Sequence, residues 1–281
     1  PIVLKSDNNT ASLIFKSGGF FGSGTGLTIN SKVSGEGVIK FERNNGAKFE
    51  IQDNFKDFTG KVMSNNQPDV NYDFNISSDN YEDRVIGYNL TGVGSYTNKS
   101  NKDLTFTNLS GFTGKLVAQN GDIVLKDEKA IDNTGKVETY NNTNITLLSN
   151  NNIEVTSINL ENKNTSEGNT NKVIKDGSGR LSLGDNTSIV NFKTFEVKSG
   201  ELELKKNIEV SNIDLKDSTK LDLNFITNGT ITSKIIGTGD LIKVGTTKID
   251  IEGSKLNSTG SIDLQEGELS VTGNKVLSNK V

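Results

Sequence analysis

The chain has 281 residues and a formal net charge of −4, and it contains no histidine and no cysteine. These absences exclude a disulfide framework, a thiolate or histidine metal site, and a catalytic triad that depends on histidine. Acidic and basic residues are interspersed, so the chain lacks the basic surface that binds nucleic acid or an anionic membrane. Only 32% of the residues are hydrophobic, which favours a thin core repeated along one axis over a wide spherical core.

The sequence also bears on where the protein resides. No apolar run reaches the length of a transmembrane helix, so we expect no membrane insertion by this segment. The chain begins with Pro1 and shows no signal peptide, and we expect it to be an internal piece of a longer protein. The lack of cysteine agrees with export, because disulfides formed in the periplasm would hinder passage through an outer membrane.

Short stretches that alternate apolar and polar residues run along the whole chain. Period two predicts strands with one buried face and one solvated face. Asn, Asp, Gly, Ser and Lys fill the intervals and predict turns, and no window carries a helical apolar stripe. We therefore expect many short strands and almost no helix. The clearest stretches are residues 27–29, 49–51, 202–204, 208–210, 213–215, 221–223, 249–251, 262–264 and 269–271.

A glycine-phased cassette recurs along the chain. Each copy opens with Gly-x-Gly, and most continue through a short strand to Thr-Gly. The Thr-Gly glycine follows the first glycine by 25, 22 and 23 residues in the first, second and fourth copies, whereas the third copy has no Thr-Gly step. Glycine is required where a strand bends sharply with positive φ. The four copies span residues 35–62, 92–125, 177–204 and 237–271.

The cassette spacing predicts an all-β fold, a right-handed parallel β-helix with three sides. One rung of such a solenoid takes roughly 20–25 residues, and the strand at 269–271 follows the strand at 249–251 by 20 residues. The alternative is a β-sandwich with similar hairpins. The Asn-Gly pairs at 120–121 and 228–229 could form hairpin turns, but their neighbouring strands are very short. We expect one β-helical segment over residues 1–281.

Residues 64–100 interrupt the cassette. This interval holds four of the five tyrosines, and we predict a loop or hairpin excursion from the rod. Tyrosine and arginine are enriched at binding hot spots, so the excursion is the candidate binding site; the alternative is that its tyrosines only pack it onto the solenoid. The candidate binding residues are Tyr72, Phe74, Tyr81, Arg84, Tyr88 and Tyr96.

No constellation in the sequence predicts catalysis. Glu201 and Glu203 flank Leu202 and are expected on an outward, solvated face. The acids at 79, 82 and 83 lack the spacing and glycine of a calcium-binding EF-hand loop. No phosphate-binding loop precedes a helix. We therefore expect no catalytic residues, no metal and no cofactor, and we predict that the protein is not an enzyme.

The cassette resembles the passenger-associated transport repeat of type V autotransporters of Gram-negative bacteria, best at residues 237–271. The richness in Lys and Asn, with only three arginines, is similar to the large autotransporter adhesins of fusobacteria. The resemblance implies a passenger that leaves through its own translocation barrel, which belongs to the full-length chain. It implies a location at the cell surface, anchored to the outer membrane or secreted.

The function expected from these features is that of an adhesin or stalk. Its partner would be a host or bacterial cell-surface protein or glycan, and not a nucleic acid. One alternative is a β-helical polysaccharide lyase or hydrolase, which would require clustered acids in a groove. Another is a surface that acts as a ligand for an immune receptor.

Overall fold

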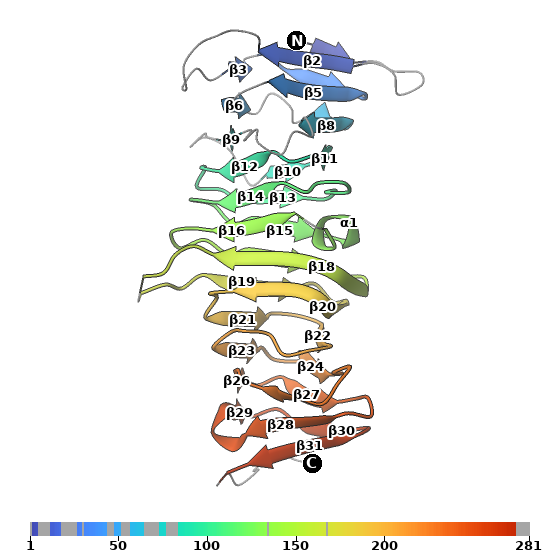
Figure 1. The fold of residues 1–281 in the computed structure, drawn as a ribbon, viewed down its shortest axis with the longest axis vertical. Coiled ribbons are helices and arrows are strands. Elements are labelled where there is room, and N and C mark those ends of the chain that lie inside the picture. The colour runs from blue at the N-terminus through green and yellow to red at the C-terminus, as the bar shows by residue number, and fades with distance from the viewer. Residues whose placement is uncertain are drawn as a thin grey trace. The chain divides into compact units, whose positions relative to one another are not determined.

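The computed structural model describes residues 2–4, 12–17, 27–29, 31–43, 48–51, 57–64, 73–76, 84–133, 135–166 and 168–273. The chain forms two compact units, Pro1–Thr143 (unit 1) and Asn144–Val281 (unit 2). Each unit is a parallel β-solenoid (Figure 1). The paired strands run parallel, which confirms the predicted solenoid and excludes the antiparallel sandwich.

Unit 1 is three-sided, because its chain visits three sheets in turn before it returns to the first. The first side holds β1 (Ile2–Leu4), β4 (Val33–Gly35) and β7 (Asp57–Phe58), and then a second sheet of β10 (Arg84–Ile86), β13 (Leu104–Phe106) and β15 (Ile123–Lys126). The next side holds β2 (Ser12–Ser17), β5 (Val38–Arg43), β8 (Lys61–Ser64) and β11 (Asn89–Thr91). The last holds β3 (Leu27–Ile29), β6 (Lys48–Ile51), β9 (Asp73–Ile76), β12 (Ser95–Asn98), β14 (Lys115–Ala118) and β16 (Lys136–Thr139).

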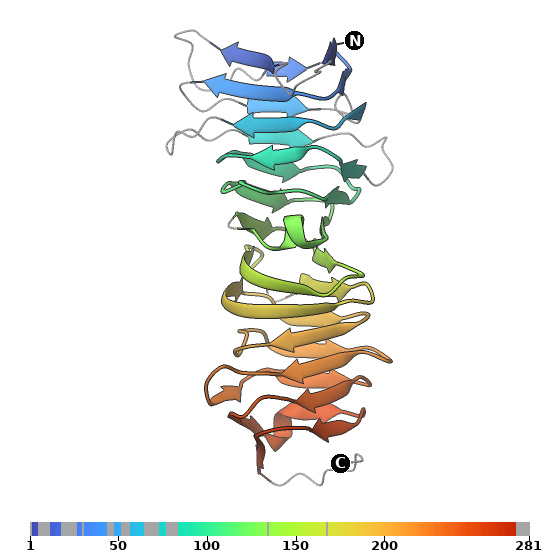
Figure 2. The same cartoon turned by 90° about the vertical axis from the view of Figure 1, so that its right-hand side faces the viewer.

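Unit 2 repeats this plan with three sets of strands (Figure 2). The set named here the β19 sheet comprises β17 (Ile145–Leu148), β19 (Lys172–Asp176), β21 (Thr194–Val197), β23 (Asn212–Leu215), β26 (Lys234–Gly237) and β29 (Leu256–Ser258). The β20 sheet comprises β18 (Ile153–Asn162), β20 (Arg180–Val190), β22 (Glu201–Leu204), β24 (Lys220–Leu223), β27 (Asp240–Lys243) and β30 (Ile262–Leu264). The third sheet comprises β25 (Gly229–Ile231), β28 (Lys248–Glu252) and β31 (Glu268–Thr272).

Helix is confined, in the described residues, to short segments such as α1 (Glu128–Ile131) and the single 3-10 turn η2 (Gly253–Lys255). This agrees with the expectation of almost no helix.

The core is built from columns of aliphatic side chains, one from each rung. Parallel pairing in register places equivalent inward residues of successive rungs side by side. Each member of one column in the β20 sheet is at most 6% exposed, and full burial of such a side chain contributes about 1.5–3 kcal/mol. The core is therefore thin and continuous within the unit. This column consists of Leu181, Leu202, Leu221, Leu241 and Ile262.

The cassette forms one corner of the solenoid, where two successive rungs stack. Gly237 has a φ of 100°, and its carbonyl oxygen accepts the backbone N–H of Thr259 in the next rung at 2.9 Å. Gly260 lies against Gly239 so closely that a Cβ atom on Gly260 would come within 3.0 Å of the Gly239 carbonyl. The same relation joins Gly92 to Thr113 and Gly35 to Thr59 in unit 1. The second glycine of Gly-x-Gly and the glycine of Thr-Gly are therefore one rung apart.

Within residues 64–100, where the sequence predicts an excursion, strands β9 to β12 belong to the sheets of the solenoid. β9 pairs with β6 and β12, β10 with β13, and β11 with β8, all in register. Their alternation of apolar and polar residues continues through the interval, and Gly92 and Gly94 open the second copy of the cassette within it. Residues 65–72 and 77–83 of that interval lie outside the described residues.

A longer connection between rungs lies in unit 2, between β18 and β19. Ile145 pairs with Val173, 28 residues later, whereas Val173 pairs with Phe195 after 22 residues. The additional residues form a loop that asparagine side chains hold together. Asn171 Nδ2 donates to Asn162 Oδ1 at 3.2 Å, and Asn169 Nδ2 donates to the Asn164 carbonyl at 2.7 Å.

Candidate functional site

Two of the predicted binding residues are core residues of unit 1. Tyr88 and Tyr96 are each 2% exposed. The ring of Tyr88 lies 6.2 Å from that of Phe58, and the ring of Tyr96 packs edge-on against Phe112 with centroids 5.8 Å apart. Burial, and then the nearby Tyr88, raise the pKa of Tyr96 well above its ordinary value. Both rings fill the solenoid, so neither presents a surface to a partner.

Of the other four candidates, two lie in strands that the structure describes. Phe74 lies in β9 and Arg84 in β10, where Arg84 pairs with Leu104 of the next rung. Tyr72 and Tyr81 lie outside the described residues. The packing alternative therefore holds for Tyr88 and Tyr96, and the binding hypothesis for the remaining four stays a prediction.

The outward face of the β20 sheet carries rows of charged side chains that run across its strands. Its first row across the strands alternates in sign, because Glu201 pairs with Arg180 on one side and with Lys220 on the other, and Lys220 pairs with Asp240. Arg180 Nε lies 3.8 Å from Glu201 Oε1. Opposite charges on neighbouring strands attract, so this row stabilises the stacking of rungs.

The second row contains two carboxyl groups side by side. Glu203 pairs with Asp222 on the next strand, with Ser182 before them and Ile242 after them. Although they stand on the outward face, Glu203 is 5% and Asp222 8% exposed. The expectation that Glu203 faces solvent is therefore wrong. Side chains of neighbouring rungs cover it, which is a consequence of register that the sequence does not display.

Glu203 is held as a carboxylate by its neighbours. Asn224 Nδ2 donates to Glu203 Oε1 at 2.6 Å, and Arg180 Nε lies 3.8 Å from Oε2. Burial acts to raise the pKa of Glu203, but the Asn224 hydrogen bond and the charges of Arg180 and Lys205 outweigh it and hold the pKa below its ordinary value. Glu203 is thus ionised at neutral pH.

Asp222 has the opposite electrostatic environment. Its Oδ1 is buried without a hydrogen-bond partner in the described residues. Burial first, and then the carboxyl groups of Glu201 and Glu203, raise the pKa of Asp222 to about 7, while Arg180 opposes this shift. A carboxyl group that titrates near neutral pH beside an ionised one can take up and release a proton. Such perturbed groups mark functional candidates.

Two lysines occupy inward positions of the core. Lys175 in β19 lies between Leu147 and Val197 of the adjacent rungs and is 1% exposed. Lys243 in β27 lies between Leu223 and Leu264 and is 0% exposed. An ammonium group at such a position requires partners, since burying an unpaired charge is costly.

Backbone carbonyls of the turns supply those partners. Lys243 Nζ donates to the carbonyls of Val244 and Gly245 at 2.6 Å each, and to Glu266 in the next rung at 3.2 Å. Lys175 makes the same set, to Asp176 at 3.4 Å, to Gly177, and to Ser199 in the next rung at 2.9 Å. Burial lowers the pKa of Lys175 to about 8. Each lysine thus fixes two stacked turns and is not a catalytic base exposed to substrate.

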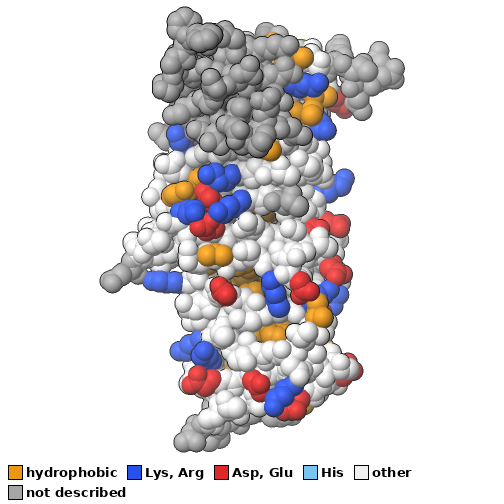
Figure 3. All heavy atoms as spheres, in the orientation of Figure 1, with side chains coloured by type: hydrophobic (Ala, Val, Ile, Leu, Met, Phe, Trp, Pro, Cys, Tyr) orange, Lys and Arg blue, Asp and Glu red, His pale blue; other side chains and the backbone are white. Residues whose placement is uncertain are grey.

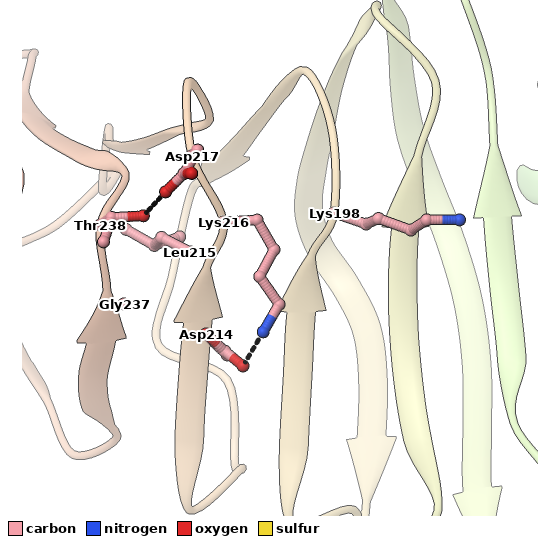
Figure 4. Close-up of a pocket in the computed structure, with 7 residues that line it drawn as sticks. All are labelled: Lys198, Asp214, Leu215, Lys216, Asp217, Gly237 and Thr238. Carbon is pink, nitrogen blue, oxygen red and sulfur yellow. Dashed lines mark hydrogen bonds and ion pairs between the residues drawn. The ribbon is translucent and has the colours of Figure 1, made fainter.

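An open pocket of about 470 Å³ lies on the β19 sheet (Figure 4). Lys198, Lys216 and Thr238 line it, and each of them has an acidic partner. Lys198 Nζ lies 2.9 Å from Asp176 Oδ2, Lys216 Nζ lies 2.6 Å from Asp214 Oδ2, and the Thr238 hydroxyl donates to Asp217. Since these charges are already paired, the pocket offers no free cation for an anionic ligand.

The surfaces of the described residues carry mixed charge. Figure 3 shows acidic and basic side chains interspersed among uncharged ones on one face. Among the described residues, no group of three or more acidic side chains is arranged to hold a metal ion. No helix in this part of the chain has the length and apolar character needed to cross a membrane.

Comparison with known proteins adds no relative. The chain matches no protein-family model, no curated protein and no solved structure.

Proposed function

We propose that this chain is a segment of a surface-displayed autotransporter passenger that acts as an adhesin or stalk. Its partner would be a host or bacterial cell-surface protein or glycan. The observation that carries the proposal is the separation of side chains within each rung. Inward residues form continuous aliphatic columns, and outward residues form polar rows. A solenoid of this kind provides a regular, extended surface for contact.

The cassette adds support from the sequence. Its glycines occupy the corner where rungs stack, as Gly237 and Gly239 do beneath Thr259 and Gly260. The resemblance to passenger-associated transport repeats therefore rests on residues with a defined role in stacking. We infer export through a translocation barrel and display at the cell surface from that resemblance.

One observation favours a second candidate, a β-helical polysaccharide hydrolase. Glu203 and Asp222 are adjacent carboxyl groups whose pKa values are shifted in opposite directions, as in acid–base pairs that cleave glycans. Their coverage argues against it, because groups that are 5% and 8% exposed leave no room for a sugar ring between them.

Surface display tests the proposal. The chain would be fused to an unrelated outer-membrane anchor in a non-adherent bacterium, and attachment to host-cell monolayers and to other bacteria would be counted against the anchor alone. An adhesin raises attachment directly. A stalk raises attachment when the chain is inserted between the anchor and a known adhesive tip. If the displayed chain is folded and neither arrangement raises attachment, the proposal is wrong.

A further inference from the structure

We infer that Asp222, together with Glu201 and Glu203, forms a proton-binding site on the outward face of unit 2, so that mildly acidic medium holds this unit together more firmly than alkaline medium. The bound proton would lie on the Asp222 carboxyl group and would be donated to the Glu201 carboxylate. The inference does not depend on the proposed function.

The site follows from register. Glu203 and Asp222 are direct partners on β22 and β24, and neighbouring strands are about 4.8 Å apart. Glu201 stands on the same face of β22, one outward position before Glu203. Three carboxyl groups therefore meet across two adjacent rungs. Like charges directly opposite each other destabilise a sheet.

The surrounding positive charge does not offset these three groups. From β20, Arg180 faces Glu201 and Glu203 at 3.8 Å. Lys205, which follows β22, is paired with Glu154 of β18. From β24, Lys220 stands beside Glu201, and it also acts on Asp240 of β27. Arg180 thus lies close to the carboxylates of Glu201 and Glu203, and its charge offsets only part of the negative charge around Asp222.

Unit 1 contains a carboxylate, Glu138, that is buried at an outward position of its strand and is surrounded by enough positive charge to offset it. Glu138 is 4% exposed, and the ammonium groups of Lys115 and Lys136 each lie 3.3 Å from its carboxylate oxygens. The Tyr140 hydroxyl donates to the same group at 3.3 Å. Glu138 shows how this fold neutralises an outward carboxylate with cations. Asp222 has no such pair of lysines, and a proton is the simplest neutralising partner.

The direction in which pH changes the stability of unit 2 follows from the pKa of Asp222 in the folded and the unfolded chain. In the folded chain Asp222 titrates at about 7, whereas in the unfolded chain it titrates near its ordinary value of about 4. Between these values the folded state holds a proton that the unfolded state has lost. Stability therefore falls as the pH rises from about 4 through 7, and it levels off above that range.

Hydrogen exchange of the intact chain tests the site, because protection of the amides in β22 and β24 reports on local stability. After correction for intrinsic exchange rates, we expect protection at pH 5 to exceed that at pH 8 by about tenfold or more. Asp222→Asn should remove most of this difference. The matched control is Asp263→Asn, at an exposed position of the same row in β30, and it should keep the difference.

Three outcomes would overturn the inference: equal protection of the wild-type chain at both pH values, an unchanged difference in Asp222→Asn, or restoration of protection at pH 8 by calcium, which would identify a metal site. If Asp222→Asn fails to fold, carboxyl carbon NMR of the wild-type chain decides. A midpoint near 7 for Asp222 supports the site, and a midpoint near 4 contradicts it.

Discussion

The carbonyl oxygen of Gly239 lies in the space that a Cβ atom on Gly260 would occupy. The two glycines stand one rung apart, and Gly114 bears the same relation to Gly94 in unit 1. Because the backbones approach this closely, the corner accepts only glycine at the Thr-Gly position. The spacing of glycines in the cassette therefore reflects the close stacking of successive rungs.

The substitution Gly260→Ala should destabilise unit 2 by about 1–3 kcal/mol, since the new methyl group forces the two turns apart. Chemical denaturation followed by circular dichroism measures the loss. Gly168→Ala is the matched control, because a Cβ there meets nothing within 4 Å, and it should leave the unfolding midpoint nearly unchanged. Equal effects of the two substitutions would show that the corner tolerates side chains.

Replacing Lys243 by methionine should cost about 1.5–3 kcal/mol, a typical contribution of hydrogen bonds made by a charged group. The side chain keeps its volume, but the carbonyls of Val244, Gly245 and Glu266 lose their donor. Lys234→Met, at an exposed position of β26, should change stability by no more than about 0.5 kcal/mol. If chemical denaturation shows that Lys243→Met is as stable as the wild-type chain, water satisfies these carbonyls equally well.

Asp240 should show a pH dependence opposite to that of Asp222. The hydroxyl and backbone N–H of Ser261 donate to Asp240 Oδ1 at 2.7 and 2.8 Å and lower its pKa. A depressed pKa stabilises the fold above the ordinary aspartate range, and the contribution disappears as the pH falls through the folded-state value.

Comparison of the wild-type chain with Asp240→Ala by urea denaturation checks this sign. The difference in the free energy of unfolding between the two proteins should be largest at pH 7 and should disappear in strong acid. Asp240→Asn, which retains an acceptor oxygen, should lose less. A gap that is constant with pH would show that the charge of Asp240 contributes nothing.

The fold was predictable from the sequence because its repeat is encoded in residue types with narrow geometry. Positive-φ glycines such as Gly237 and the Thr-Gly step at 259–260 mark the corner, and the alternating triples mark the strands. Residues 64–86 contain no glycine, so the cassette does not mark the strands in that part of the chain. Its described strands still pair in register, and Tyr88 and Tyr96 are large enough to fill the core in place of aliphatic residues.

The carboxyl site could not be predicted, since Glu203 and Asp222 meet only through the pairing of β22 with β24. Alternation alone assigns both to solvent. The buried lysines were missed for a similar reason, although they leave a weak signal. Lys175 and Lys243 are each followed by Gly two positions later and by another glycine one rung beyond, Gly200 and Gly267.

Binding of the purified chain to intact cells is the most direct test of the central claim, that this solenoid is a contact surface and not a catalyst. The chain would be titrated onto host and bacterial cells, and the length of the surface glycans would be measured afterwards. We predict saturable binding that excess unlabelled chain displaces, with glycans of unchanged length. Shortened glycans would contradict this, and so would the absence of saturable binding to every cell type in a chain that also fails to raise attachment as a spacer below an adhesive tip.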